Sequence, residues 1–153
     1  MPLFDVRSPS EFANGHAPGA ISLPLFSDGE RAEIGTVYKQ QSPAKAVRLG
    51  LKYAGLRMAD LVAEVDARVK RDATPVEVYC WRGGQRSGSV AWLLGTAGYQ
   101  VNRWEGGYKA YRGRVLESWG AERPYVVLAG LTGSGKTEVL RAMLELGAPV
   151  LDL

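Results

Sequence analysis

The stretch Val76-Glu77-Val78-Tyr79-Cys80-Trp81-Arg82-Gly83-Gly84-Gln85-Arg86-Ser87 decides the fold of this chain. It reads as a short strand, a tight loop that opens with the only cysteine, and the start of a helix. The residues Val76, Val78 and Tyr79 favour a buried strand. Beyond the loop, apolar residues from Val90 to Leu94 recur at helical spacing, and Gly98 is placed to end that helix.

The loop after this strand is predicted to hold a reactive thiol. Free N–H groups at a helix N-terminus attract negative charge, and neighbouring arginines make a thiol easier to ionise. Two adjacent glycines let the backbone N–H groups converge on one point. We therefore predict Cys80 as a nucleophile within an anion-binding loop formed by Trp81, Arg82, Gly83, Gly84, Gln85, Arg86 and Ser87. The alternative is an inert cysteine buried in the core.

The composition limits the class of protein. The chain has 153 residues, with 46% hydrophobic and 23% charged residues, as in a soluble globular protein. No apolar run is long enough to cross a membrane, and no signal peptide is recognisable. A single cysteine excludes an internal disulfide and agrees with a cytoplasmic location. The net charge of +3 permits nucleic acid as a partner without requiring it.

Strands and helices alternate through the first 120 residues, which predicts an α/β domain with a parallel sheet flanked by helices. Further strands are expected at Leu3–Val6, Ile21–Pro24 and Gln100–Trp104. Capping boxes at Ser8/Glu11 and Ser27/Glu30 open two helices, and Ser42-Pro43 supplies an N-cap and a first-position proline for a third. Later helices are expected over Ala44–Ala54, Leu56–Arg71 and Tyr108–Gly120. In the last of these, aromatic and apolar residues at helical spacing are interpreted as core: Tyr108, Tyr111, Val115 and Trp119.

A second segment, residues 121–153, begins where the composition changes at Glu122-Arg123-Pro124. A buried strand is expected at Tyr125–Ala129 and another at Ala148–Leu153. Between them lies a complete phosphate-binding P-loop pattern: Gly130, Leu131, Thr132, Gly133, Ser134, Gly135, Lys136 and Thr137. In such a loop the backbone cradles phosphates, Lys136 reaches the terminal ones, and Thr137 holds Mg²⁺ if a metal is used.

This P-loop unit is incomplete, because one strand, loop, helix and strand cannot complete a nucleotide-binding sheet. Asp152 is the only downstream acid on an expected strand. We therefore expect the sequence to be a fragment of a longer protein. Residues 121–153 are expected to be mobile or to borrow contacts from a neighbour, since their strands have unpaired edges.

The first 120 residues resemble a rhodanese domain. The resemblance rests on Asp5-Val6-Arg7-Ser8-Pro9-Ser10-Glu11-Phe12, on Gly15-His16-Ala17-Pro18-Gly19-Ala20, and on the Cys80 loop with Glu105-Gly106-Gly107-Tyr108. It implies that Arg7 and Glu11 form a structural pair and that His16 lies at a structural corner.

The active loop differs from the common rhodanese pattern by one residue. Five residues separate Cys80 from Arg86, where ordinary rhodaneses have four, and a wider loop suits a tetrahedral phosphate-like group. With Glu30-Arg31-Ala32-Glu33-Ile34-Gly35-Thr36-Val37-Tyr38-Lys39-Gln40-Gln41 and the P-loop, the chain resembles the tRNA 2-selenouridine synthase family. That resemblance implies tRNA as substrate, selenophosphate as selenium donor and geranyl diphosphate as a further substrate. A selenophosphate-supplying enzyme would be a partner, and use of a nucleotide or Mg²⁺ stays open.

Three alternatives remain from the sequence. The chain could be a rhodanese-type sulfurtransferase that passes a persulfide from Cys80 to an acceptor. It could be a phosphatase or arsenate reductase with the same cysteine–arginine spacing, although no loop aspartate is evident as an acid. The fragment alone could also be an inactive binding module.

Two clusters of basic residues are candidates for a tRNA-facing surface. The favoured cluster is near the active loop and consists of Arg82, Arg86, Arg103, Lys109, Arg112 and Arg114; the other consists of Lys45, Arg48, Lys52 and Arg57.

Overall fold

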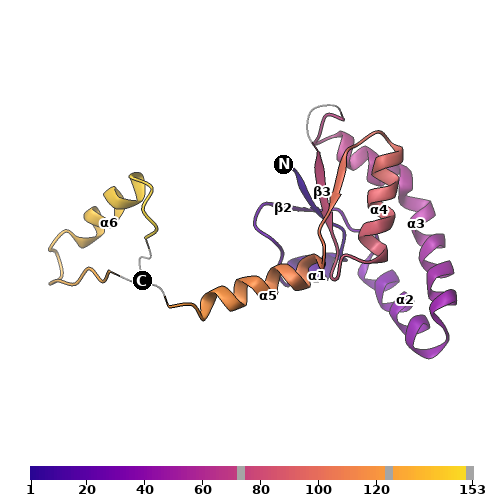
Figure 1. Ribbon diagram of the computed structural model, residues 1–153, viewed down its shortest axis with the longest axis horizontal. Helices are drawn as coiled ribbons and strands as arrows, with labels where there is room; N and C mark the ends of the chain where they lie inside the picture. Colours follow the sequence, from indigo (N-terminus) through magenta and orange to yellow (C-terminus); the bar gives the residue numbers. More distant parts are fainter. Residues whose placement is uncertain (72–74, 123–125, 151–153) are drawn as a thin grey trace. The chain divides into compact units, whose positions relative to one another are not determined.

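The computed structural model describes residues 1–71, 75–122 and 126–150. The chain divides into two compact units, Met1–Trp119 and Gly120–Leu153. The division lies close to the border expected from the composition change. The two units are described separately below (Figure 1).

Four parallel strands form the sheet of the first unit, in the order β2-β1-β3-β4. Their bounds are β1 Leu3–Asp5, β2 Ala20–Ser22, β3 Val76–Tyr79 and β4 Val101–Arg103. The carboxyl ends of parallel strands meet at one edge of the sheet. The segment after β1 and the Cys80 loop after β3 therefore emerge side by side, and the predicted parallel α/β fold is confirmed.

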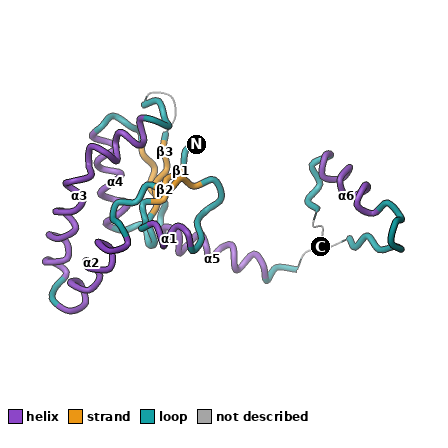
Figure 2. Tube along the Cα trace, turned by 180° about the vertical axis from the view of Figure 1, so that it is seen from behind, coloured by secondary structure: helices purple, strands orange, loops and turns teal. Residues whose placement is uncertain are grey.

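Helices α2 (Asp28–Gln40), α3 (Pro43–Asp66) and α4 (Gln85–Thr96) lie together on one side of the sheet (Figures 1 and 2). Successive strand residues point to opposite faces. Phe4 and Val78 enter the main core under these helices. Leu3 and Tyr79 point to the opposite face, where they meet aromatic residues that include Tyr108 and Tyr111. These two come from α5 (Gly107–Trp119), and α1 (Pro9–Ala13) follows β1.

The helix starts agree with the predicted caps. In α2 the Ser27 N–H donates to the Glu30 side chain at 2.7 Å, and the Glu30 N–H donates to the Ser27 hydroxyl at 3.3 Å. At α3 the Lys45 N–H donates to the Ser42 hydroxyl at 3.2 Å. Each cap satisfies a backbone donor that the first helical turn leaves unpaired.

The prediction of two helices between residues 44 and 71 is wrong, because α3 runs unbroken from Pro43 to Asp66. Gly55 costs a helix only about 1 kcal/mol relative to alanine. Buried residues on both sides of that glycine, Ala46 and Leu61 among them, hold the two halves on one core. The helix ends at Asp66, whose carboxylate pairs with Arg71.

The prediction that Trp119 belongs to the core is also wrong. Tyr108 and Tyr111 at the start of α5 are partly buried against the sheet, whereas the Trp119 side chain is 77% exposed. Across the described residues, no helix is both long and apolar enough to span a bilayer.

In the second unit the described residues contain one helix, α6 (Lys136–Glu145). The expected buried strand at 125–129 is not formed within its described part, where Val126 is 97% and Val127 84% exposed. Residues 148–150 of the other expected strand are not a strand either. Tyr125, Asp152 and the rest of 151–153 lie outside the described residues. A strand requires a pairing partner for its backbone groups, and no neighbouring strand is present among residues 126–150.

Candidate active site

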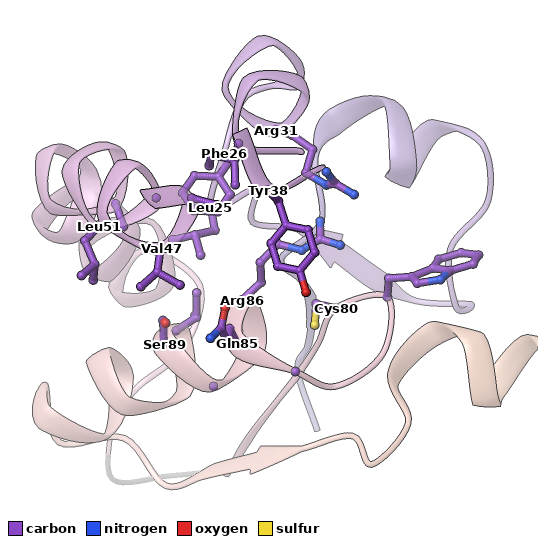
Figure 3. Close-up of a pocket in the computed structure, with 18 of the residues that line it drawn as sticks. Leu25, Phe26, Arg31, Tyr38, Val47, Leu51, Cys80, Gln85, Arg86 and Ser89 are labelled. Carbon is purple, nitrogen blue, oxygen red and sulfur yellow. The ribbon is translucent and has the colours of Figure 1, made fainter. Parts of the chain in front are cut away.

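Cys80 follows β3 and lies at the base of a groove. Its residue is only 3% exposed, yet it lines a cavity of about 1060 Å³ that is bounded by α2, α3 and α4. Figure 3 shows the sulfur at the foot of this cavity, close to the start of α4. The thiol is thus shielded from bulk water but faces a space that a ligand can enter.

The surroundings of Cys80 favour the thiolate. Burial alone raises the pKa of the thiol, but hydrogen bonds from the Ser87 hydroxyl and from the backbone N–H groups of Ser87 and Arg82 outweigh it, aided by the charge of Arg86. The net pKa of Cys80 is lowered. A thiolate is the nucleophilic form of cysteine. The loop therefore supplies the electrostatics that the sequence predicted.

Ser87 contacts the sulfur through its hydroxyl. Its hydroxyl oxygen is 3.3 Å from Cys80 Sγ and 3.2 Å from the carbonyl oxygen of Gly84, and the residue is fully buried. One hydroxyl proton can serve either acceptor. When the sulfur is ionised the hydroxyl can donate to it, and when the sulfur is protonated the hydroxyl can donate to Gly84.

The start of α5 forms backbone hydrogen bonds with the Cys80 loop. The Tyr108 N–H donates to the Cys80 carbonyl and the Lys109 N–H to the Trp81 carbonyl, both at 2.9 Å. Two glycines make this approach possible. A Cβ on Gly83 would lie 2.6 Å from the Trp104 carbonyl oxygen, and a Cβ on Gly107 would overlap the Cys80 carbonyl oxygen. Both glycines have positive φ, 67° and 57°.

The ion pairs at this edge correct one expectation. Arg7 does not pair with Glu11; it forms a buried pair with Asp5, with Arg7 Nη2 2.5 Å from Asp5 Oδ2. Glu11 instead pairs with Arg86, with Nη1 2.5 Å from Oε2. Asp5 ends β1 and lies two residues from Arg7, with which it makes several hydrogen bonds, whereas the Glu11 carboxylate on α1 pairs with Arg86 of the Cys80 loop.

Arg86 therefore does not point freely at the thiol. Its guanidinium is fixed by Glu11, while the residue still lines the groove and lowers the pKa of Cys80. The pKa of Glu11 is itself lowered: burial raises it, but the hydrogen bond and charge of Arg86 prevail, with help from the Ser8 N–H and Arg31.

The other predicted loop residues separate into two groups. Lining the groove with Cys80 and Arg86 are Trp81, Arg82, Gly84 and Gln85. Gly83 and Ser87 support the loop from inside. His16 is a structural turn residue as predicted, since its ring stacks on Phe12 at 3.8 Å.

Sequence reasoning missed the groove wall formed by α2 and α3. One face of α2 lines the cavity, and its residues recur at helical spacing: Arg31, Ile34, Gly35, Tyr38 and Lys39. These residues belong to segment 30–41, which the sequence connects to the site only through a family resemblance. The helical spacing of these residues is recognisable in the sequence, but no neighbouring residue in the sequence connects them to Cys80.

Of the predicted P-loop residues, Gly130–Gly135 precede α6, and Lys136 and Thr137 are its first two residues. Gly133 and Gly135 have φ of 81° and 80°. Lys136 Nζ donates to the carbonyls of Gly130 at 2.8 Å and Leu131 at 2.7 Å, and Thr137 lies in the first turn of the helix. The lysine folds over its own loop. Phosphate binding by Gly130–Thr137 stays a prediction.

No cluster of three or more potential metal-ligating side chains is found within residues 1–71, 75–122 and 126–150.

The family model of the rhodanese-like domain matches residues 1–114. The chain belongs to the rhodanese-like domain family. The parallel sheet and the cysteine loop between β3 and α4 lie within the matched residues.

Curated relatives carry the name tRNA 2-selenouridine synthase. The protein from Bordetella bronchiseptica is 47% identical over 93% of this chain and 40% of its own length. The protein from Bdellovibrio bacteriovorus is 43% identical over 100% of this chain and 41% of its own length. The predicted resemblance to that family is confirmed, and the chain spans about 40% of the length of the relatives it matches.

A solved structure matches the rhodanese-like domain. It is the N-terminal domain of a Clostridium difficile 630 protein whose name proposes ATP or GTP binding. The two are 39% identical with a TM-score of 0.66, over 74% of this chain and 88% of the other.

Proposed function

We propose that this chain is the selenium-transfer part of a cytoplasmic tRNA 2-selenouridine synthase. The reaction replaces the sulfur of 2-thiouridine at the wobble position of tRNA by selenium, with selenophosphate as donor. One observation carries the proposal: a thiol with a lowered pKa, in a loop with the wider cysteine–arginine spacing, at the base of an open groove. The names of the curated relatives support the same reaction.

The loop would bind the phosphate part of selenophosphate. Backbone N–H groups at the start of α4 and the guanidinium of Arg86 supply donors, and Arg82 adds a second positive charge at the rim. The groove admits a substrate to Cys80, and the 3% exposure of that residue limits screening of these interactions by bulk water. Cys80 would act as the nucleophilic thiolate within this site.

The second unit would bind a diphosphate-containing substrate. A complete P-loop pattern precedes α6, and its lysine already faces the loop that would receive phosphate. We propose geranyl diphosphate as that substrate, for geranylation of the same thiouridine. An enzyme that synthesises selenophosphate would be the partner that supplies the donor.

A second candidate function is a sulfurtransferase that carries a persulfide on Cys80. Membership of the rhodanese-like family favours it. The five-residue spacing to Arg86 argues against it, because a bare sulfane sulfur needs less space than a phosphate.

The test is to incubate the protein with selenophosphate and thiolated tRNA and to analyse the nucleosides by mass. We expect 2-selenouridine from the wild type and none from Cys80→Ala, since removal of the sulfur removes the nucleophile. A thiosulfate–cyanide assay is run in parallel. High cyanide turnover without selenouridine would support the sulfurtransferase and contradict the proposal.

A further inference from the structure

The groove beside Cys80 is positively charged. Four cationic side chains line it, Arg31, Lys39, Arg82 and Arg86, and of the described residues that line it none is aspartate or glutamate. Glu11 pairs with Arg86 and Arg31 but does not itself line the groove. This arrangement favours an anionic occupant that extends beyond the small anion held at the loop.

The groove also presents exposed aromatic side chains. Tyr38 on α2 is 59% exposed and Trp92 on α4 is 64% exposed, and both line the cavity. Figure 3 shows the Tyr38 ring pointing from α2 toward the loop that carries Cys80 and Arg86. Burying large aromatic surface is favourable, so rings left open at a groove are suited to stacking on a planar partner.

Arg31 lies about two turns before Tyr38 on α2, Lys39 directly follows Tyr38, and all three line the groove. A groove that offers both cations and an exposed ring suits a single nucleic-acid strand, which presents both phosphates and bases. Apolar residues also line the groove, Leu25 and Phe26 among them. A partner helix would fit these apolar residues but would leave Lys39 and Arg82, which do not pair with Glu11, without anions.

We propose that this groove binds single-stranded RNA, with one unpaired base stacked on Tyr38 and flanking phosphates bound by Arg31 and Lys39. The proposal rests on the proposed function, which supplies RNA as the substrate. A base within a duplex cannot reach a sulfur that is 3% exposed, so the RNA must present the base unstacked. The groove, rather than the α5 face with Lys109, Arg112 and Arg114, is then the RNA-binding surface.

The test measures binding of the full 153-residue chain to a fluorescent RNA stem–loop that holds one 2-thiouridine in its loop. The competitor is the same RNA annealed to its complement. We expect Tyr38→Ala to raise the Kd by about 5- to 150-fold, the range that base–aromatic stacking supplies, and Tyr38→Phe to restore most of the affinity. Arg31→Ala and Lys39→Ala should each reduce the slope of log K against log salt by about 0.7.

Two matched controls lie outside the groove. Trp119→Ala removes another exposed ring, and Arg112→Ala with Arg114→Ala removes two charges from α5; neither should change the Kd by more than about twofold. Equal affinity for loop and duplex, no binding by the wild type, or loss of binding only in the α5 variant would overturn the proposal.

The mass assay separates this proposal from the proposed function. If Tyr38→Ala binds loop RNA normally and still forms 2-selenouridine, the groove assignment is wrong and the function stands. If loop RNA binds through Tyr38 but no selenouridine forms with selenophosphate, the function is wrong and the groove assignment stands.

Discussion

Substituting Gly107 by alanine tests whether the active loop depends on the segment after β4. Gly107 has a φ of +57°, and a Cβ there would overlap the Cys80 carbonyl oxygen and lie 2.6 Å from the Gly83 nitrogen. The backbone conformation alone costs an alanine about 1–2 kcal/mol, and forcing two packed backbones apart costs about 1–3 kcal/mol more. We therefore expect Gly107→Ala to lower the free energy of unfolding by about 2–5 kcal/mol.

Two other glycines separate the causes. Gly19 has a φ of +75° with nothing within 4 Å of a Cβ, so Gly19→Ala should show the backbone cost alone, about 1–2 kcal/mol. Gly113 lies inside α5 with open space around it, and Gly113→Ala should stabilise the chain by about 0.5–1 kcal/mol. Urea unfolding followed by circular dichroism measures all three.

The same three variants also test how the loop conformation affects the pKa of the Cys80 thiol. Displacement of the loop in Gly107→Ala should move N–H groups away from the sulfur and raise the pKa of Cys80, which shifts the pH midpoint of its alkylation by iodoacetamide upward. Gly19→Ala and Gly113→Ala should leave that midpoint unchanged. If Gly107→Ala is no less stable than Gly19→Ala and its alkylation profile matches the wild type, the proposed support of the loop is wrong.

Three further predictions follow from contacts at the same edge of the sheet. Ser87→Ala should raise the pKa of Cys80, because a hydroxyl donor to the thiolate is lost, and an unchanged alkylation midpoint would contradict this. Glu11 has a folded-state pKa below its ordinary 4.5, so its contribution to the free energy of unfolding is complete above pH 4.5 and is lost as the pH falls through the folded-state pKa. The stability difference between wild type and Glu11→Gln should therefore vanish in acid. A difference that persists in acid would refute the ion pair as its source. Asp5→Asn should lower the free energy of unfolding by about 3–5 kcal/mol, because it leaves the buried guanidinium of Arg7 without its charged partner. Asp66→Asn, in an exposed ion pair, should have a far smaller effect. Similar urea midpoints for the two variants would contradict this prediction.

Features encoded within a few residues could be predicted from the sequence. The strand before Cys80, the glycine loop and the helix after it follow from short patterns, and so do the caps at Ser27 and Ser42. Each cap depends on a side chain and a backbone group no more than three residues apart. Local chemistry alone is sufficient for such elements.

Features that depend on distant residues could not be predicted. Glu11 is 75 residues from Arg86, and only the parallel order of β1 and β3 brings them together. Glu11 pairs with Arg86 and not with Arg7, because Arg7 is bound by Asp5. In the same way the expected strand near Val126 needed pairing residues that the described part of the second unit does not supply.

The electrostatics of the site depend on the same kind of distant contact. In a trans peptide the C=O and the following N–H point in opposite directions. The Lys109 N–H holds the Trp81 carbonyl from behind at 2.9 Å, so the N–H of Arg82, in the same peptide unit, is turned toward the Cys80 sulfur, to which it donates. A buried sulfur would otherwise have a raised pKa, since burial is the largest influence on it. The reactive state of Cys80 is therefore set as much by the start of α5 as by the loop that contains the cysteine.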